Sequence, residues 1–178
     1  MAKVKWTLDP THSEVQFKIK HLMIATVTGQ FTKFDANVET DDEDFLTAKV
    51  VFTADVNSIT TNNEQRDGHL KSADFFEAAN YPQVRFVATK YENVDNDGSY
   101  ELYGDLTIRD ITKNIKLDVE FGGIIKDPWG NTRAGFTITG KINRKEFGLV
   151  WHVATEAGGV MVGDEVRIHA GVEFIKQA

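Results

Sequence analysis

Apolar and polar residues alternate with a period of two along most of the chain. Val15, Phe17 and Ile19, for example, alternate with polar or charged neighbours. The same alternation recurs at 48–54, 84–88, 102–108, 115–121, 134–142 and 166–174. A period of two predicts strands with one buried and one solvated face, which is typical of antiparallel sheets.

The register of this pattern changes between residues 26 and 39. Apolar residues fall on odd positions up to Phe31 and on even positions from Phe34 onward. We predict a bulge or bend near Thr32 and Lys33, as curved sheets require. Turn signals separate the other rows, at 95–98, 109–110, 127–131 and 163–164. Short strands at this spacing favour a barrel or a sandwich over a fold of alternating strands and helices.

One stretch, near 61–80, predicts helix instead. Thr61 and Glu64 have the spacing of a capping box, which would begin a helix that continues to about Lys71. Ser72 would cap a second short turn that contains two phenylalanines and ends before Pro82. No repeat or linker interrupts the chain, and we predict a single domain over residues 1–178.

Composition agrees with a β fold. The chain has 17 Val, 12 Ile and 17 Thr against 8 Leu, and β-branched residues suit a pleated, half-buried surface. The formal net charge of −7 argues against binding to nucleic acid and to anionic membrane surfaces. The absence of cysteine excludes disulfides, thiolate catalysis and cysteine-ligated metals. No apolar run reaches the ~18 residues of a membrane span.

The first six residues carry positive charge but no apolar stretch follows them, so they do not resemble a secretory signal. We therefore expect a cytoplasmic protein, or a periplasmic or secreted one if a leader has been removed.

Few residues suggest catalysis or metal binding. None of the histidines forms a metal-type pair, and we expect no metal and no cofactor; the histidines are His12, His21, His69, His152 and His169. The parity of the last strand predicts that His169 points outward to solvent. The acidic run at 41–44 fits a solvated hairpin loop better than a calcium site, because it lacks the alternate ligand spacing of calcium loops.

Two clusters allow two interpretations each. Arg66 and His69 lie on one face of the predicted helix beside Leu70, where they could line the mouth of a pocket. Alternatively, Arg66 and Asp67 clasp the helix onto the sheet, which we favour. The segment 9–13 is either the edge of a pocket or a turn into the first strand, and we favour the turn.

The aromatic content and the small residues point to a possible cavity. The 12 Phe, 3 Trp and 4 Tyr would first of all fill a β core. A barrel of about eight strands is just wide enough to fill with side chains or to hold one small ligand. Small residues on the inward rows would leave such space; they are Ala48, Ala54, Ala88, Gly104, Gly140 and Ala170.

An ordered set of motifs over nearly the whole chain resembles the YceI-like family. The motifs are LDP and HS at 8–13, VTGQF at 27–31, NSITT at 57–61, RDGHL at 66–70, SADFF at 72–76, YP at 81–82, GDLT at 104–107, NRKEFG at 143–148 and VGDEV at 162–166. The resemblance implies an all-β, antiparallel, lipocalin-like barrel that holds a long apolar ligand, a polyisoprenoid or a related lipid amide or acid. It implies no enzymatic activity. Many family members carry a secretory signal, and this sequence differs in that respect.

We therefore predict a lipid-binding protein, which would serve carriage, storage or sequestration. The predicted wall residues are Phe17, Ile19, Phe31, Phe52, Phe86, Leu106, Phe136 and Ile138. The predicted lid or mouth consists of Leu70, Phe75, Phe76 and Trp151, and the polar partners of a ligand head group are Arg66 and His69.

Two other functions remain open. A small enzyme acting on an apolar substrate would need convergent acid–base side chains, drawn from His12, His21, His69, Asp55, Asp67 and Asp74. An interaction module would have a barrel filled by its own side chains. An exposed edge strand or an apolar barrel face could also pair two copies into a homodimer.

Overall fold

The protein is described by a computed structural model, which covers residues 2–151 and 162–177. Within these residues eleven strands and one α-helix follow one another along the chain. Their order is β1 (Lys3–Leu8), β2 (Glu14–His21), β3 (Ala25–Phe31), β4 (Phe34–Asp41), β5 (Asp44–Asp55), β6 (Ile59–Thr60), α1 (Glu64–Lys71), β7 (Gln83–Glu92), β8 (Ser99–Ile108), β9 (Ile111–Lys126), β10 (Thr132–Asn143) and β11 (Val162–Lys176).

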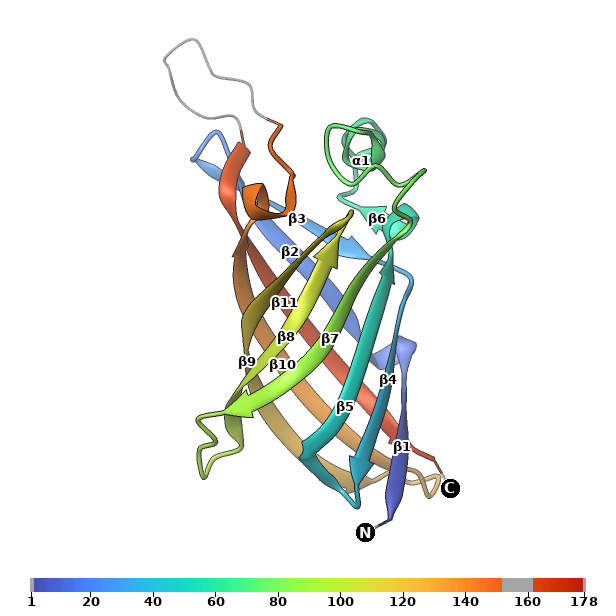
Figure 1. The fold of residues 1–178 in the computed structure, drawn as a ribbon. Helices are drawn as coiled ribbons and strands as arrows, with labels where there is room; N and C mark the ends of the chain where they lie inside the picture. Colours follow the sequence, from blue (N-terminus) through green and yellow to red (C-terminus); the bar gives the residue numbers. More distant parts are fainter. Residues whose placement is uncertain (1, 152–161, 178) are drawn as a thin grey trace.

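The sheet closes on itself because β1 pairs with both β4 and β11. The closed ring consists of eight strands, in the order β1-β4-β5-β7-β8-β9-β10-β11, and every neighbouring pair is antiparallel (Figure 1). The predicted all-β antiparallel barrel of about eight strands with a short helical segment is therefore confirmed. Among the described helices, none has the length and apolar character needed to cross a membrane.

The wall extends beyond the closed ring at one end. The C-terminal part of β11 pairs with β1, whereas its longer N-terminal part pairs with β2, which pairs in turn with β3. A 3₁₀ turn, Pro10–His12, separates β1 from β2, and the Asp9 carboxylate caps it by accepting a hydrogen bond from the Thr11 amide at 3.0 Å. The favoured interpretation of 9–13 as a turn is confirmed. Helix α1 lies at this extended end of the barrel (Figure 1).

The predicted bend at Thr32 and Lys33 is present between β3 and β4. The Thr32 amide donates to the Ser58 carbonyl at 3.2 Å, and the Lys33 amide donates to the Ser58 hydroxyl at 3.0 Å. These bonds replace the strand ladder at the bend. The inward parity therefore shifts, so that odd residues of β3 and even residues of β4 face the same interior.

The helix begins two residues later than the sequence predicts. Its cap is Asn63, whose side-chain oxygen accepts from the Arg66 amide at 3.0 Å. Asn caps as well as Thr does. Thr61 is instead buried, and its hydroxyl donates to Asp67 at 2.6 Å. The helix end at Lys71 is as predicted, and the Ser72 hydroxyl accepts from the Asp74 amide in the following turn.

The turn predicted at Gly163 and Asp164 is wrong, because both residues lie within β11. The pairing of β11 with β2 shifts register between Val162 and Val166, so a bulge absorbs the irregularity. A Cβ on Gly163 would lie 3.3 Å from the Cβ of Lys20. The glycine thus marks a close approach between two strands rather than a reversal of the chain.

Candidate functional site

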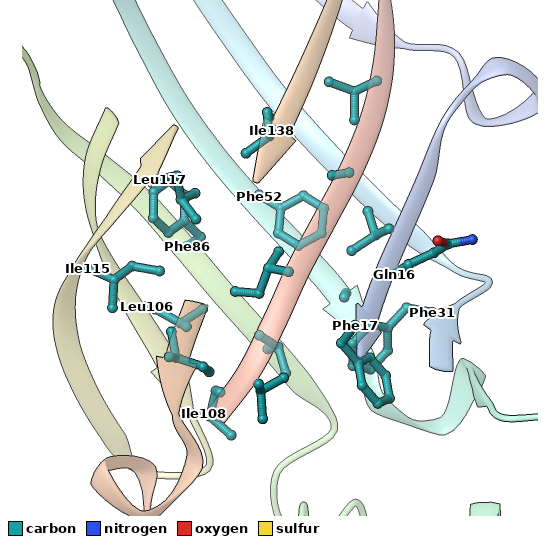
Figure 2. Close-up of a pocket in the computed structure, with 18 of the residues that line it drawn as sticks. Gln16, Phe17, Phe31, Phe52, Phe86, Leu106, Ile108, Ile115, Leu117 and Ile138 are labelled. Atoms are coloured by element: carbon teal, nitrogen blue, oxygen red, sulfur yellow. The ribbon is translucent and has the colours of Figure 1, made fainter. Parts of the chain in front are cut away.

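The barrel encloses an apolar cavity of about 400 Å³. Its walls are the inward rows of the strands, and Figure 2 shows Phe52, Phe86, Leu106, Ile115 and Ile138 directed into it from several strands. Gln16 also borders the cavity, but its amide points away from these apolar side chains. The volume lies within the range of small-molecule binding sites, which are typically concave and mostly apolar. A barrel filled by its own side chains is therefore not what forms.

Aromatic rings close the end of the cavity away from α1. Phe45, the second residue of β5, lies 4.7 Å from Trp6 and 4.8 Å from Phe136 between ring centroids. Phe121 stacks on Phe136 at 5.1 Å, and Phe174 contacts it at 6.0 Å. The Trp6 indole donates to the Thr40 hydroxyl at 3.0 Å, which satisfies its buried N–H.

At the α1 end the cavity reaches the surface. His69 packs edge-to-face against both Phe75 and Trp151, with centroids 5.0 and 4.8 Å away. Its Nε2 lies 2.9 Å from a carboxylate oxygen of Asp74. This cluster joins α1 and the turn after it to the segment that precedes residue 152, so it crosses the mouth of the cavity.

Arg66 combines both functions that the sequence allowed. Its Nε donates to the Thr61 hydroxyl at 2.7 Å, and its terminal nitrogen donates to the Thr61 carbonyl at 2.8 Å. Asp67 accepts from the Thr61 amide at 2.8 Å, so both side chains clasp α1 to the end of β6. Arg66 nevertheless remains exposed and borders the cavity.

Arg144 is a buried cation beneath the mouth. It is 1% exposed, and its guanidinium donates to the carbonyls of Gly163 at 2.8 Å, Leu149 at 2.6 Å and Trp151 at 2.8 Å. The nearest carboxylate among the described residues, Asp164, is 3.8 Å away, and burial lowers the pKa of Arg144. Backbone carbonyls rather than a close ion pair therefore hold this guanidinium. Arg144 thus joins residues 149–151, which we call the mouth segment, to β11.

Two buried tyrosines border the other half of the cavity. Tyr91 and Tyr100 meet edge-to-face with centroids 5.6 Å apart, and the Tyr91 hydroxyl donates to the Ala48 carbonyl at 2.8 Å. Burial raises the pKa of Tyr91 to about 12 and raises that of Tyr100 as well. Both phenols therefore stay neutral at ordinary pH.

Two glycines do not leave the space that the sequence suggested. A Cβ on Gly104 would lie 2.3 Å from the tip of the Phe86 ring, and one on Gly140 would lie 2.5 Å from a methyl carbon of Leu117. Each glycine is therefore covered by a large side chain of the neighbouring strand. Because the ring and the methyl group can lie against the wall there, they project less into the interior, which helps to keep the cavity open.

All fourteen residues predicted to bind a ligand line the cavity: Phe17, Ile19, Phe31, Phe52, Arg66, His69, Leu70, Phe75, Phe76, Phe86, Leu106, Phe136, Ile138 and Trp151. Lining residues that were not predicted include Phe45, Tyr91, Tyr100 and Arg144. Tyr91 was hidden by a register shift between Ala88 and Lys90, which reverses the parity of β7. Tyr100 shares the parity of Leu102 and could have been found from it.

The acid–base candidates are only partly brought together. His69 contacts Asp74 at the mouth. His12 lies 2.8 Å from Asp9 on the 3₁₀ turn, and neither His12 nor Asp9 lines the cavity. Asp55 caps a separate 3₁₀ turn, and Asp67 serves the Thr61 clasp. His21 lines the rim at the end of β2. His152 lies outside the described residues.

His169 is half-buried rather than exposed to solvent as predicted. It lies on β11 between the partner strands β2 and β10, opposite Gln16 and Thr139, and its Nδ1 is buried without a hydrogen-bond partner among the described residues. Neighbouring side chains on the outer face of the three strands therefore cover part of the ring.

One group of possible metal ligands already contains a cation. Oxygen and nitrogen atoms of Asp9, His12 and Glu173 lie within 4.8 Å of one another. Arg133 donates to Asp9 at 2.8 Å and to Glu173 at 2.9 Å, and its Nε donates to Asp127 at 2.6 Å. The hydroxyl of Thr11 and the guanidinium of Arg133 hold the pKa of Asp9 well below its usual value. Arg133 therefore forms ion pairs with three carboxylates, two of which belong to this group.

The acidic run at 41–44 forms the hairpin loop that the sequence favoured. Asp41 ends β4 and Asp44 begins β5, so the two residues between them form the turn. The Lys3 ammonium pairs with Asp41 at 2.5 Å, and Lys176 pairs with Glu43 at 3.0 Å.

Comparison with known sequences finds a matching family and bacterial relatives. The profile of one family, described as the YceI-like domain, matches residues 6–174. The UPF0312 protein SAUSA300_2620 of Staphylococcus aureus strain USA300 is 42% identical over 170 residues, which cover 95% of this chain and 96% of the relative. The UPF0312 protein SA2479 of strain N315 is 43% identical over 171 residues, with the same coverage.

Solved structures show the same fold. The Campylobacter jejuni YCEI protein aligns with a TM-score of 0.76 at 35% identity, over 90% of this chain and 91% of that one. Burkholderia cenocepacia BcnA aligns with a TM-score of 0.77 at 24% identity, over 93% and 98%. A polyisoprenoid binding domain from Saccharophagus degradans aligns with a TM-score of 0.70 at 16% identity, over 97% and 98%. The last two similarities establish the fold alone.

Proposed function

The chain belongs to the YceI-like family, and from this premise we propose that it binds a long apolar lipid, a polyisoprenoid or a related lipid amide or acid, inside its barrel. The observation that carries the proposal is the cavity of about 400 Å³, which is walled almost entirely by carbon. A structural neighbour, the domain from Saccharophagus degradans, is itself described as polyisoprenoid binding.

Affinity in such a site comes mainly from the area of the wall. Each CH₂ group that leaves water contributes about 0.8 kcal/mol, so a long chain gains much more from burial than from a single hydrogen bond. Branched prenyl units would pack against the Phe, Leu and Ile side chains of the wall. A ligand with a short tail would leave part of the cavity empty and bind more weakly.

The head group would lie at the α1 end. His21, Arg66 and His69 line the cavity there, and no Asp or Glu belongs to its described lining. Arg66 and His69 can donate hydrogen bonds to a phenol, an amide or a carboxylate. The opposite end offers neutral tyrosines and an aromatic closure instead, so we propose that the tail enters first.

We further propose that the lipid is held without chemical conversion, for carriage, storage or sequestration. The candidate acid–base residues occupy several separate places, with only His69 and Asp74 in contact at the mouth. That pair lies at the surface of the cavity, away from the tail-binding wall.

Native mass spectrometry of the protein purified without detergent tests the proposal. We expect a mass increment that solvent extraction removes, and uptake of an added prenyl alcohol such as farnesol by the extracted protein. The recovered farnesol should have an unchanged mass after prolonged incubation. Absence of both a bound lipid and farnesol uptake would contradict the binding proposal, and a changed mass would contradict the proposal that the protein performs no chemistry.

A further inference from the structure

The tip of the β2–β3 hairpin combines apolar side chains with an unfavourable backbone. Leu22 and Met23 have φ angles of 52° and 59°, and the Ile24 amide donates to the His21 carbonyl at 3.2 Å. Two successive positive φ values in such a turn favour Asn and Gly, whereas Leu and Met rarely adopt them. The turn therefore contains two residues that are unfavourable for its backbone conformation, which costs free energy.

These residues are also exposed. Leu22 is 36% exposed, Met23 57% and Ile24 84%, so three consecutive large apolar side chains face solvent. We call Leu22, Met23 and Ile24 the hairpin tip. Exposed apolar side chains that cluster in this way mark interaction surfaces more often than single ones do.

The hairpin tip is part of the rim of the cavity. Ile19 and His21 of β2 and Val27 of β3 line the cavity just behind it. Figure 1 places the β2–β3 hairpin at the same end of the barrel as α1. Val150, between the cavity-lining residues Leu149 and Trp151, is 59% exposed at this end as well.

The charge around the hairpin differs from that of the whole protein. Residues 15–34 contain no Asp or Glu, although the chain carries a net charge of −7, and they include Lys18, Lys20 and Lys33. Lys18 and Lys20 are exposed on β2, which leads to the tip. An apolar tip with exposed lysines on the strand next to it complements a lipid surface that carries anionic head groups.

The other exposed apolar residues lack this complementarity. Leu46, Val94, Ile125 and Trp129 belong to the opposite end of the barrel, where each lies within a few residues of a carboxylate. Leu46 follows the acidic run at 41–44, Val94 precedes Asp95, and Trp129 follows Asp127. Carboxylates flank these residues, whereas residues 15–34 contain none, so charge complementarity favours the hairpin tip.

We propose that the hairpin tip inserts into the surface of a bilayer that contains anionic lipids and thereby holds the mouth of the cavity against the membrane. A lipid could then pass between bilayer and barrel with little exposure of its tail to water. The carboxylates of the adjacent strand β11, Asp164 and Glu165, pair with Lys145 and Arg167, so they do not neutralise the lysines of the hairpin.

Vesicle flotation with the full chain tests this proposal. The wild type is expected to float with vesicles of phosphatidylcholine mixed with phosphatidylglycerol, and less with phosphatidylcholine alone or at high salt. The double variant L22N/M23G supplies the residues that the turn favours and removes two apolar side chains. It should bind the mixed vesicles at least about tenfold more weakly while its melting temperature stays equal or rises.

Three controls separate the alternatives. Trp129→Ser removes an apolar residue that is 81% exposed at the other end and should leave flotation unchanged, whereas Lys18→Glu should weaken binding to the mixed vesicles only. The affinity of L22N/M23G for farnesol in solution should equal that of the wild type, so that loss of lipid binding and loss of membrane docking are distinguishable.

The proposal is overturned if the wild type does not float with mixed vesicles, or if L22N/M23G floats as well as the wild type. Light scattering supplies a further decisive outcome. A dimer in solution that L22N/M23G separates into monomers would assign the hairpin tip to a second copy of the chain instead of to a membrane.

Discussion

Arg144 is a buried charged residue, so its loss of hydration must be compensated by other hydrogen bonds. A guanidinium with no close carboxylate would be costly to bury, and three backbone carbonyls within 2.8 Å make up for the lost water. These carbonyls belong to the mouth segment and to the start of β11. One side chain thus fixes the two pieces of chain that frame the cavity opening.

We expect Arg144→Met to lower the free energy of unfolding by about 3 kcal/mol, because it leaves several buried carbonyls without donors. Urea denaturation measures the change. Lys145→Met, which replaces the exposed neighbour, serves as the matched control and should cost less than about 0.5 kcal/mol. Equal effects of the two substitutions would contradict this role of Arg144.

Asp9 supplies a pH-dependent contribution to stability. Its pKa is lowered in the folded state from the usual 3.8 by Thr11 and Arg133, so the folded protein binds this proton less readily than the unfolded chain does. The resulting stabilisation is fully present above the unfolded pKa and is lost as the pH falls through the folded pKa.

Denaturation at a series of pH values should therefore show stability falling as the pH drops below about 4, with a smaller fall for Asp9→Asn. Asp97→Asn is a suitable comparison, since Asp97 also has a lowered pKa but lies on an exposed turn and lacks a cationic partner among the described residues. If Asp9→Asn kept the full acid dependence of the wild type, the Arg133 network would not be its source.

At the scale of elements, α1 is held mainly by polar contacts. It has no buried residue, and the Thr61 clasp through Asp67 joins it to β6. The aromatic contacts of His69 with Phe75 and Trp151 add a second attachment across the mouth. An element with so little burial of its own can open locally without unfolding the barrel.

Asp67→Ala should therefore lower the free energy of local opening of α1 by about 1–3 kcal/mol, since it removes the acceptor of two hydrogen bonds. Hydrogen exchange should speed up in residues 64–71 and not in the barrel strands, and a bound prenyl alcohol should dissociate faster. Gln65→Ala on the exposed part of the helix should change neither rate. Uniformly faster exchange throughout the protein would argue that α1 is not a separate unit.

The elements also show what the sequence can reveal. The period-two pattern predicted the cavity wall, because strand geometry sends alternate side chains to opposite faces wherever the register is unbroken. It predicted the bend at Thr32 and Lys33, where the parity of a long apolar row changes, but it failed at the register shifts near Tyr91 and Gly163, where only a few residues follow the shift. It also missed the close approach of Phe86 to Gly104, which depends on pairing between strands. The Asn63 cap was missed because Thr61 offered an equally good signal.

For the whole molecule, the distinction that matters is between an open and a filled barrel. Aromatic clusters lie at the two ends, around Phe45 and around His69, and the walls between them combine aliphatic side chains with phenylalanines. Closure at one end and a polar rim at the other define a direction of entry for a ligand.

Ala170→Phe tests whether the barrel contains an open cavity. Ala170 lines the cavity between Val15 and Ile138, so a phenyl ring there would project into the lumen. In a filled core the extra volume would destabilise the protein by about 1–3 kcal/mol. In an open cavity stability should be nearly unchanged while affinity for farnesol falls about tenfold or more. Thr139→Phe adds the same ring to the exposed outer face and should preserve affinity.

The most direct test of the central claim is a crystal structure of the protein purified without detergent or incubated with a long prenyl alcohol. We expect continuous elongated density along the cavity, with its polar end near Arg66 and His69 and its tail near Tyr91 and Tyr100. A cavity that is collapsed or filled with ordered water after both preparations would contradict lipid binding in the barrel.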